Sequence, residues 1–194
     1  MNRISFMMLA ILLPTVVSCG GKEKTTIDSD NRGVAANSDA DYDKAIAECT
    51  EAIRLNPKDA SQYRFRGFCR AQKGEHDKAI ADFTEAIRID PKDGAAFGSR
   101  GSCYSQKGEH DKAIADYTEA IRLDPKDAAA YYSDRGDSHA NKGEHDKAIA
   151  DYTEVIRLDP KDAAAYSERA KSYRVMGDEA KAAIDEKKAQ ELKK

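Results

Sequence analysis

Three histidines recur at matching places in this sequence and are the first candidates for metal chemistry. His76, His110 and His145 each follow Gly-Glu and precede Asp-Lys. Neutral imidazole is a common zinc ligand, with zinc–nitrogen distances of about 2.0–2.1 Å. Packed helices lie about 8–10 Å apart, so equivalent side chains of successive units do not easily converge on one ion. We expect half-buried turn residues here, no metal site and no cofactor, and His139 stands apart from the set.

Arginines and carboxylates also recur together, in a pattern that predicts ion pairs. A planar guanidinium donates two parallel hydrogen bonds to a carboxylate. We expect each arginine to pair with an acid on a packed helix, because the acid recurs wherever the arginine does. The alternative is that the arginines point into a groove as ligand contacts. In chain order the arginines and their acids are Arg32, Arg66, Arg100, Arg135, Arg169 and Glu48, Asp82, Asp116, Asp151, Asp185.

Charge and composition exclude several classes of protein. The 194 residues carry 32 Lys and Arg against 35 Asp and Glu, a net charge of −3. That balance argues against a nucleic-acid-binding protein, which normally shows a basic excess. Five prolines and twelve glycines exclude a collagen-like chain. No nucleophile elbow, phosphate loop, HExxH or dinucleotide fingerprint is present, so we expect a protein that is not an enzyme.

The first residues have the pattern of an export signal. Arg3 precedes an apolar run from Ile4 to Val17, which is too short to span a membrane. The run ends in Val16-Val17-Ser18-Cys19, which resembles the bacterial lipobox. The resemblance implies removal of residues 1–18 and attachment of diacylglycerol and palmitate to Cys19. It also implies a lipid-anchored protein of the bacterial cell envelope, at the outer membrane in a Gram-negative host. The alternative is an ordinary secretory signal with an incidental cysteine.

A polar segment follows the cysteine. Residues 19–40 are rich in Gly, Ser, Asn, Asp, Thr and Lys and show almost no apolar periodicity. Such a composition favours a tether, and about 20 flexible residues reach roughly 25 Å. A degraded helix over residues 26–38 is the alternative, because Arg32-Gly33 and Ala36 echo the downstream pattern.

The remaining sequence is a repeat of about 34 residues. Pro57, Pro91, Pro125 and Pro160 mark the period. Asp59 is placed as an N-cap of a first helix, and Gly74 as its C-terminal stop. Apolar residues at helical spacing then form the buried stripe of a second helix: Ala79, Ile80, Phe83, Ala86 and Ile87. The pattern therefore predicts that each unit folds as a helix–turn–helix.

The order of small and large residues resembles the tetratricopeptide repeat. In the third unit the matching residues are Phe97, Gly101, Tyr104, Ala113, Tyr117, Ala120 and Pro125. The resemblance implies an all-α solenoid of antiparallel helix pairs coiled into a right-handed superhelix. It divides the array, residues 41–194, into a partial unit at 41–59, three units at 60–93, 94–127 and 128–162, and a capping unit at 163–194.

One extra residue lengthens the fourth unit. Elsewhere the aromatic residue precedes its arginine by three positions, and Tyr132 with Arg135 keeps that spacing. We therefore place the insertion in the Ala128–Tyr131 stretch, with Tyr132 in the core slot and Tyr131 as an exposed aromatic. A π-bulge within the helix is the less economical alternative.

By the same resemblance, the first helices line a concave groove that suits an extended peptide. Arg64 and Phe68 are expected at one end, and Lys171 and Arg174 at the other. The Lys/Asn arrangement with which chaperone-binding relatives hold a terminal carboxylate is absent. A partner that docks on a face or edge is the alternative. The groove residues are Ser61, Arg64, Phe68, Gln72, Ala95, Gly98, Ser102, Gln106, Ala130, Ser133, Asp137, Asn141, Ala164, Ser167, Lys171 and Arg174.

Three cysteines remain once Cys19 is set aside. Cys69 and Cys103 are equivalent residues of neighbouring units, which places their Cα atoms beyond the roughly 7 Å limit of a disulfide. Cys49 and Cys69 form the only plausible bridge. We favour small buried thiols instead.

Three functions follow from these patterns. The first is a membrane-tethered adaptor that binds a protein or peptide in the cell envelope. The second is a structural subunit of an envelope assembly, stacked end to end through Tyr131 and the Cys49 face, so an oligomer is possible. The third, an enzyme, is the least favoured.

Overall fold

The computed structural model describes residues 39–193, which fold into helices connected by short turns. No strand occurs in this range, so the all-α prediction is confirmed. The export signal, Cys19, Arg32 and the possible helix at 26–38 lie outside the described residues. The helices are α1 (Asp39–Leu55), α2 (Ala60–Gln72), α3 (His76–Ile89), α4 (Gly94–Gln106), α5 (His110–Leu123), α6 (Ala128–Asn141), α7 (His145–Leu158), α8 (Ala163–Val175) and α9 (Glu179–Leu192).

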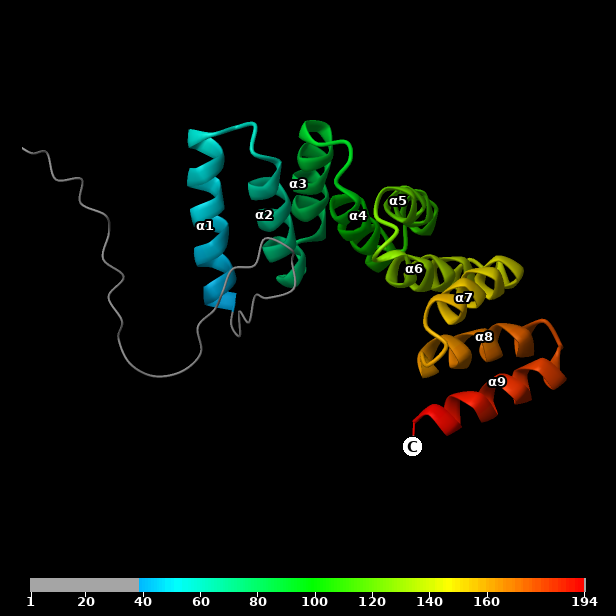
Figure 1. Cartoon of the computed structure of the whole chain (residues 1–194). Coiled ribbons are helices and arrows are strands. Elements are labelled where there is room, and N and C mark those ends of the chain that lie inside the picture. The colour runs from blue at the N-terminus through cyan, green and yellow to red at the C-terminus, as the bar shows by residue number, and fades with distance from the viewer. Residues whose placement is uncertain (1–38, 194) are drawn as a thin grey trace, which may run out of the picture.

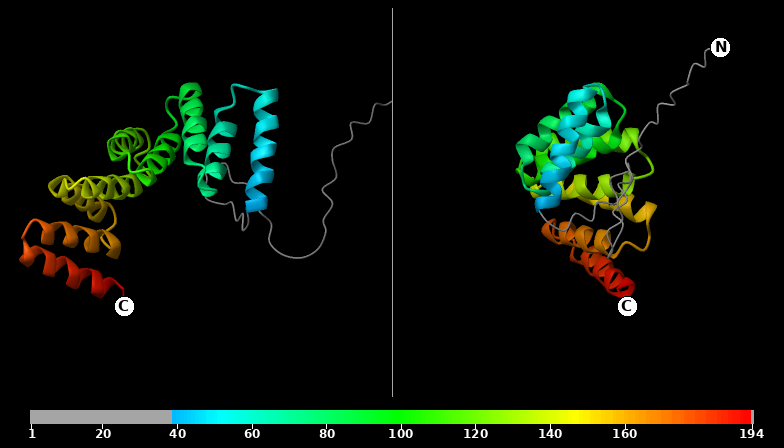
Figure 2. Two further views of the ribbon diagram at one scale, coloured as in Figure 1. Left: turned by 180° about the vertical axis from the view of Figure 1, so that it is seen from behind. Right: turned by 90° about the vertical axis from the view of Figure 1, so that its left-hand side faces the viewer.

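The helices form a solenoid rather than a bundle around one centre. Each helix packs chiefly against the helix before it and the helix after it. In addition, α2 touches α4 and α4 touches α6, whereas α3, α5 and α7 make no comparable contacts with each other. The first helices of the units therefore lie on the tighter, inner radius. Figures 1 and 2 show the resulting arc from α1 to α9. The predicted helix-pair solenoid is confirmed.

Local sequence explains where the helices begin and end. The Asp59 carboxylate accepts a hydrogen bond from the Ser61 amide at 3.1 Å and caps α2. Asp93 caps α4 in the same way through the Ala96 amide at 3.0 Å. The turn after α2 contains Gly74 with φ +73°, a conformation that glycine adopts without steric strain. The sequence prediction of these cap and stop residues is confirmed.

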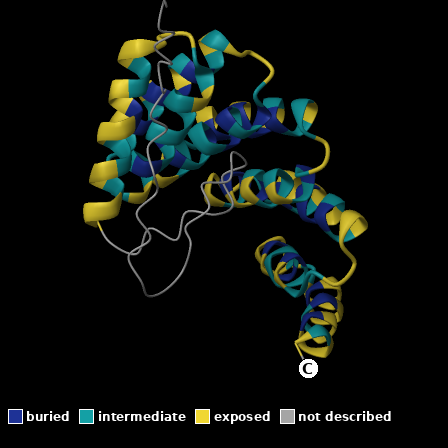
Figure 3. Cartoon of the chain, turned by 60° about the vertical axis from the view of Figure 1, so that its left-hand side comes forward, coloured by how far each residue is buried: buried dark blue, intermediate teal, exposed yellow. Residues whose placement is uncertain are grey.

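The core is a thin layer between paired helices. Ala79, Phe83 and Ala86 of α3 are fully buried against α2 and α4. The close approach depends on Gly67, because a Cβ there would lie 3.0 Å from the Phe83 ring. Figure 3 shows buried positions along the helix interfaces and exposed positions along the outer edges. Each unit therefore buries surface both between its own two helices and against the neighbouring units.

The insertion of the fourth unit lies at the start of α6. This helix has 14 residues, whereas α2, α4 and α8 have 13 each. Arg135 lies 5.3 Å from the Tyr132 ring centre, and the equivalent Arg100 lies 5.5 Å from the Phe97 ring centre. The register that pairs Tyr132 with Arg135 is thus confirmed. The extra residue also removes a cap, because Asp127 makes no side-chain capping hydrogen bond at α6.

Tyr131 differs from the prediction. It was expected to be an exposed aromatic, but its side chain is half-buried and its ring lies against Gly98 of α4. A Cβ at Gly98 would stand 2.4 Å from Tyr131 Cε1. The ring therefore occupies space that any other residue at position 98 would fill.

Among the helices described, none is long and apolar enough to cross a lipid bilayer.

Candidate functional site: the inner face

A repeated three-residue bridge holds the inner helices in place. In the third unit, Arg100 of α4 donates from Nε and Nη2 to the two oxygens of Asp116, each at 2.8 Å. Its Nη1 donates to Thr84 Oγ1 of the preceding unit at 3.1 Å. One guanidinium therefore joins the first helix of a unit to the second helices of two units.

The same bridge recurs in every complete unit, so four of the predicted Arg–carboxylate pairs are confirmed. Arg32, the predicted partner of Glu48, lies outside the described residues. The threonine was not predicted, although it occupies the same position in each unit. In the second unit Arg70 also reaches Asp82, at 2.8 Å. The other bridges consist of Arg66, Asp82 and Thr50; Arg135, Asp151 and Thr118; and Arg169, Asp185 and Thr153.

The first end of the predicted groove is largely engaged within the chain. Arg64 forms an ion pair with Asp93 of α4's N-terminus at 2.9 Å, and both side chains are mostly buried. Phe68 is half-buried and packs against the core of Ala79, Phe83 and Cys103. Ser61 donates from its hydroxyl to the Asp59 carboxylate. Gln72 is exposed.

The predicted residues of α4 and α6 lie among hydroxyl groups of the second helices. Ser102 lies near the Tyr117 hydroxyl, and Gln106 donates to the Ser102 hydroxyl at 3.4 Å. Asp137 accepts a hydrogen bond from the Tyr152 hydroxyl at 2.7 Å. Burial raises the pKa of both tyrosines, and the bond to Asp137 raises that of Tyr152 further.

The remaining residues of this part are small or exposed. Asn141 and Ala130 are exposed, Ser133 and Ala95 are half-buried, and Gly98 is buried. The structure therefore leaves the amide of Asn141 accessible at the C-terminal end of α6.

The other end of the predicted groove is also paired internally. Lys171 donates to Glu168 at 2.6 Å, and Arg174 donates to Glu186 at 2.6 Å. Ala164 is exposed, and Ser167 is half-buried with its hydroxyl bonded to the Ala163 carbonyl. The basic residues expected at both ends thus have their charges matched by acids, which belong to the same helix for Lys171 and to a neighbouring element for Arg64 and Arg174.

Asp134 of α6 is a site residue that the sequence did not single out. Its side chain is exposed, and it makes no hydrogen bond or ion pair with the residues described. Neighbouring atoms nevertheless desolvate part of the carboxyl group. This desolvation, together with the negative charge of Asp137, raises the pKa of Asp134 to about 6. Desolvation also raises the pKa of Asp137, and the charge of Glu168 adds to this effect. The hydrogen bond from Tyr152 and the charge of Lys171 oppose it.

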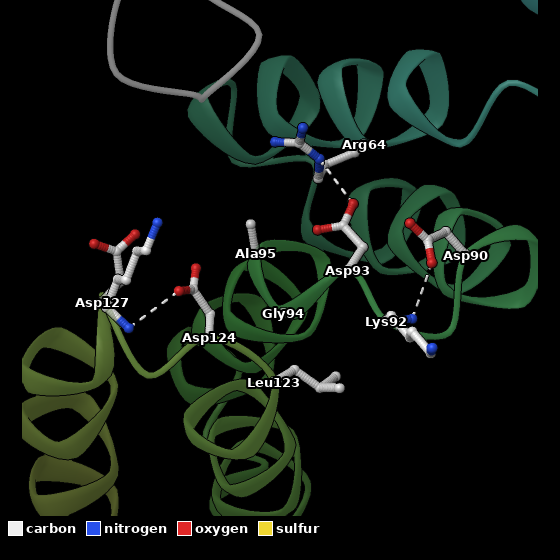
Figure 4. Close-up of a pocket in the computed structure, with 10 residues that line it drawn as sticks. Arg64, Asp90, Lys92, Asp93, Gly94, Ala95, Leu123, Asp124 and Asp127 are labelled. Atoms are coloured by element: carbon white, nitrogen blue, oxygen red, sulfur yellow. Dashed lines mark hydrogen bonds and ion pairs between the residues drawn. The ribbon is translucent and has the colours of Figure 1, made fainter.

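A cavity opens beside this region, at the N-terminal ends of α4 and α6. Its volume is about 900 Å³, and Figure 4 shows several of its walls. Arg64 and Asp93 close one side as an ion pair, and Asp124 and Asp127 stand on the opposite side. The lining residues are Arg64, Asp90, Lys92, Asp93, Gly94, Ala95, Leu123, Asp124, Lys126 and Asp127.

The histidines do not gather. His76, His110 and His145 each begin a different second helix and are half-buried. His139 is buried and its Nδ1 lies 2.7 Å from Glu144 Oε2. Within residues 39–193, no group of three or more His, Cys, Asp or Glu is arranged to hold a metal ion.

The described cysteines are buried free thiols. Cys49, Cys69 and Cys103 are unpaired with one another, so the favoured prediction is confirmed and the Cys49–Cys69 bridge is absent. Burial raises the pKa of each thiol to about 11. They are therefore packing residues rather than nucleophiles.

Comparison with known families identifies the repeat. Family models described as Tetratricopeptide repeat match residues 31–94 and 94–127, and one described as TPR repeat matches residues 136–177. No curated protein matches the sequence significantly.

Solved structures have the same fold. The crystal structure of MamA has a TM-score of 0.77 and 27% identity, and the match covers 79% of this chain and 90% of that one. MamA from Desulfovibrio magneticus RS-1, solved from residue 41 to its end, has a TM-score of 0.74 and 19% identity, covering 78% and 85%. YrrB, a TPR protein with an unusual peptide-binding site, has a TM-score of 0.71 and 23% identity, covering 79% and 78%.

Proposed function

We propose that this chain, which is built of tetratricopeptide repeats, is a scaffold whose inner face binds an extended segment of a partner protein. The observation that carries the proposal is a row of exposed amides. Gln72, Gln106 and Asn141 are the last residues of α2, α4 and α6, and all three are exposed. An amide both donates and accepts hydrogen bonds, so it matches the alternating groups of a peptide backbone.

The spacing of the amides fits an extended chain. Packed helices lie about 8–10 Å apart, and an extended peptide advances about 3.3 Å per residue. One unit therefore corresponds to about three residues of bound peptide. The three amides span two such intervals, so a segment of about seven residues would meet all of them. Binding rather than catalysis is proposed, because the thiols are buried and the repeated acids and lysines are paired with each other.

Site-specific crosslinking tests where the partner binds. The photoreactive residue p-benzoylphenylalanine is placed at Gln106 or Asn141 on the inner helices, and at Ala115 or Ala150 on α5 and α7 as controls. All four positions are exposed, so the replacements are matched in accessibility. We expect partner adducts from positions 106 and 141 only. Adducts from positions 115 and 150 alone would place the partner on the outer face and refute the proposal.

The scaffold is further proposed to be membrane-tethered in the bacterial cell envelope through lipidated Cys19. Support comes from the sequence Val16-Val17-Ser18-Cys19 after an apolar run. Two acyl chains anchor a protein stably, whereas one is marginal. Labelled palmitate should be incorporated by the native chain and not by Cys19→Ala, which should also leave the membrane fraction. Equal labelling of both proteins would exclude this anchor.

An alternative role is that of a structural subunit stacked end to end. Two large apolar side chains on the terminal helices favour it: Leu55 of α1 is 71% exposed and Ile184 of α9 is 68% exposed. Light scattering should then show a mass that rises with protein concentration. Ile184→Glu should abolish that rise while leaving the inner-face crosslinks intact.

A further inference from the structure

The middle of the inner face carries negative charge that the residues described neutralise only in part. We define the α6 stripe as Tyr131, Asp134 and Asp137, which follow one another at intervals of three residues on α6. Side chains three apart on a helix are neighbours, with Cβ atoms about 5–6 Å apart. The three side chains therefore form one continuous surface.

Asp134 is the centre of this surface. The equivalent residue of the next unit, Glu168, has Lys171 as its partner at 2.6 Å. The carboxylate of Asp134 has no hydrogen-bond or ion-pair partner among the residues described, and its strongest charged neighbour is Asp137. Its ionised form is therefore disfavoured by its surroundings, and a cation brought by a ligand would remove that penalty.

Tyr131 gives the stripe an aromatic wall. Burial raises the pKa of its phenol to about 12, and the charges of four nearby carboxylates add to this effect: Asp124, Asp127, Asp93 and Asp134. Three of these acids also line the cavity of about 900 Å³. The nearby Arg64 is matched by Asp93. The side chain of Tyr131 is held in place by α4, because its ring lies against Gly98.

We propose that the α6 stripe binds an Arg or Lys side chain of the partner segment, with the stem of that side chain against Tyr131 and its charge beside Asp134 and Asp137. The inference rests on the proposed peptide-binding function and names the chemistry of the ligand. Aromatic rings attract cations to their faces, and carboxylates form charge-assisted hydrogen bonds with them. Two carboxylates are too few for a calcium site, which takes six to eight oxygens.

Peptide binding tests the proposal directly. Three labelled decapeptides serve as probes: alternating Gly and Arg, alternating Gly and Glu, and alternating Gly and Gln. Fluorescence anisotropy is measured with the full chain at about 0.15 M salt, where long-range attraction is largely screened. We expect the Arg peptide to bind at least about tenfold more tightly than the Glu peptide, the factor expected for one charge-assisted hydrogen bond.

Matched variants separate the stripe from general electrostatics. Asp134→Asn/Asp137→Asn should weaken binding of the Arg peptide by about tenfold or more. Asp134→Asn alone disturbs no contact within the chain and should account for much of that loss. The control Asp146→Asn/Glu154→Gln makes the same change in charge on α7, and affinity should stay within about twofold. Circular dichroism establishes that all variants remain helical.

The outcomes are decisive. An Arg peptide that binds no better than the Glu peptide, or that fails to bind at about 1 mM, overturns the inference, as does a control that weakens binding as much as the stripe variant. If the neutral Gln peptide binds equally well and inner-face crosslinks form, the charge inference fails while the scaffold function stands. Loss of the inner-face crosslinks would instead contradict the scaffold function itself.

Discussion

The bridge between Arg100, Asp116 and Thr84 predicts a large and specific loss of stability on removal of its carboxylate. The Arg100 side chain is 17% exposed and that of Asp116 is 9% exposed, so the pair is mostly buried. Breaking a buried ion pair by removing one partner costs about 3–5 kcal/mol, because the other charge stays buried. Arg100 keeps its bond to Thr84 and its place near the Phe97 ring. We therefore expect Asp116→Ala to lose about 3 kcal/mol, the lower end of that range.

Urea unfolding followed by circular dichroism at 222 nm measures this loss. With an m-value of about 2 kcal/mol/M, the midpoint should fall by about 1.5 M. Glu119→Ala in the same helix is the matched control. It breaks the exposed pair with Arg122, whose N–O distance is 2.9 Å, and should lose less than about 1 kcal/mol.

A double variant tests the physical cause. Arg100→Met/Asp116→Leu removes both charges and fills the space with apolar groups, so it should recover most of the stability lost in Asp116→Ala. The reasoning is refuted if Asp116→Ala is no more harmful than Glu119→Ala, or if the double variant is less stable than Asp116→Ala.

Three further predictions follow from single contacts. Gly101→Ala places a Cβ 3.0 Å from Tyr117 Cε1, and we expect the free energy of unfolding in urea to fall by about 1 kcal/mol. A rise in that free energy would show that the Tyr117 ring moves aside without cost. Met176 stands where earlier units have a lysine such as Lys107, which binds Asp77 of the preceding unit at 2.6 Å. Met176→Lys should therefore gain about 0.2–1 kcal/mol through Asp146, seen as a higher Tm, and the gain should vanish in combination with Asp146→Asn. The pKa of Asp134 is raised from 3.8 to about 6, so its folded form binds the proton more tightly and its contribution to stability falls as pH rises from about 4 to 6. Asp134→Asn should remove that fall, and an unchanged slope of stability against pH would contradict the assignment.

Sequence reasoning succeeded where structure depends on local register. The caps, the glycine stops and the Arg–carboxylate pairs all recur at fixed spacing, and packing between adjacent helices preserves that spacing. The pairing of Tyr132 with Arg135 could be found because the other units supply the rule. The bridging threonines could also have been found from their recurrence. Thr84 is exposed, however, and its hydroxyl joins the bridge because the arginine of the next unit donates to it.

The inner face was less predictable, because its chemistry depends on side chains from other helices. Arg64, Lys171 and Arg174 were expected as ligand contacts. In the folded chain they instead form ion pairs with Asp93, Glu168 and Glu186. The insertion adds a second obstacle. Each residue of an α-helix advances the helix by about 100°, so the insertion changes the face on which the residues before it lie. The exposure of Tyr131 could therefore not be predicted from the equivalent positions of the other units.

The threonine of the bridge also gives the array a direction. Each unit presents its threonine to the arginine of the unit that follows, and Thr153 of α7 does so for Arg169. In α9 the corresponding position, two residues after Asp185, is Lys187. An ammonium group has no lone pair to accept the next guanidinium's hydrogen bond, and it would repel that charge. The series of bridges therefore stops at α9, because the residue in the threonine position there cannot accept an arginine's hydrogen bond.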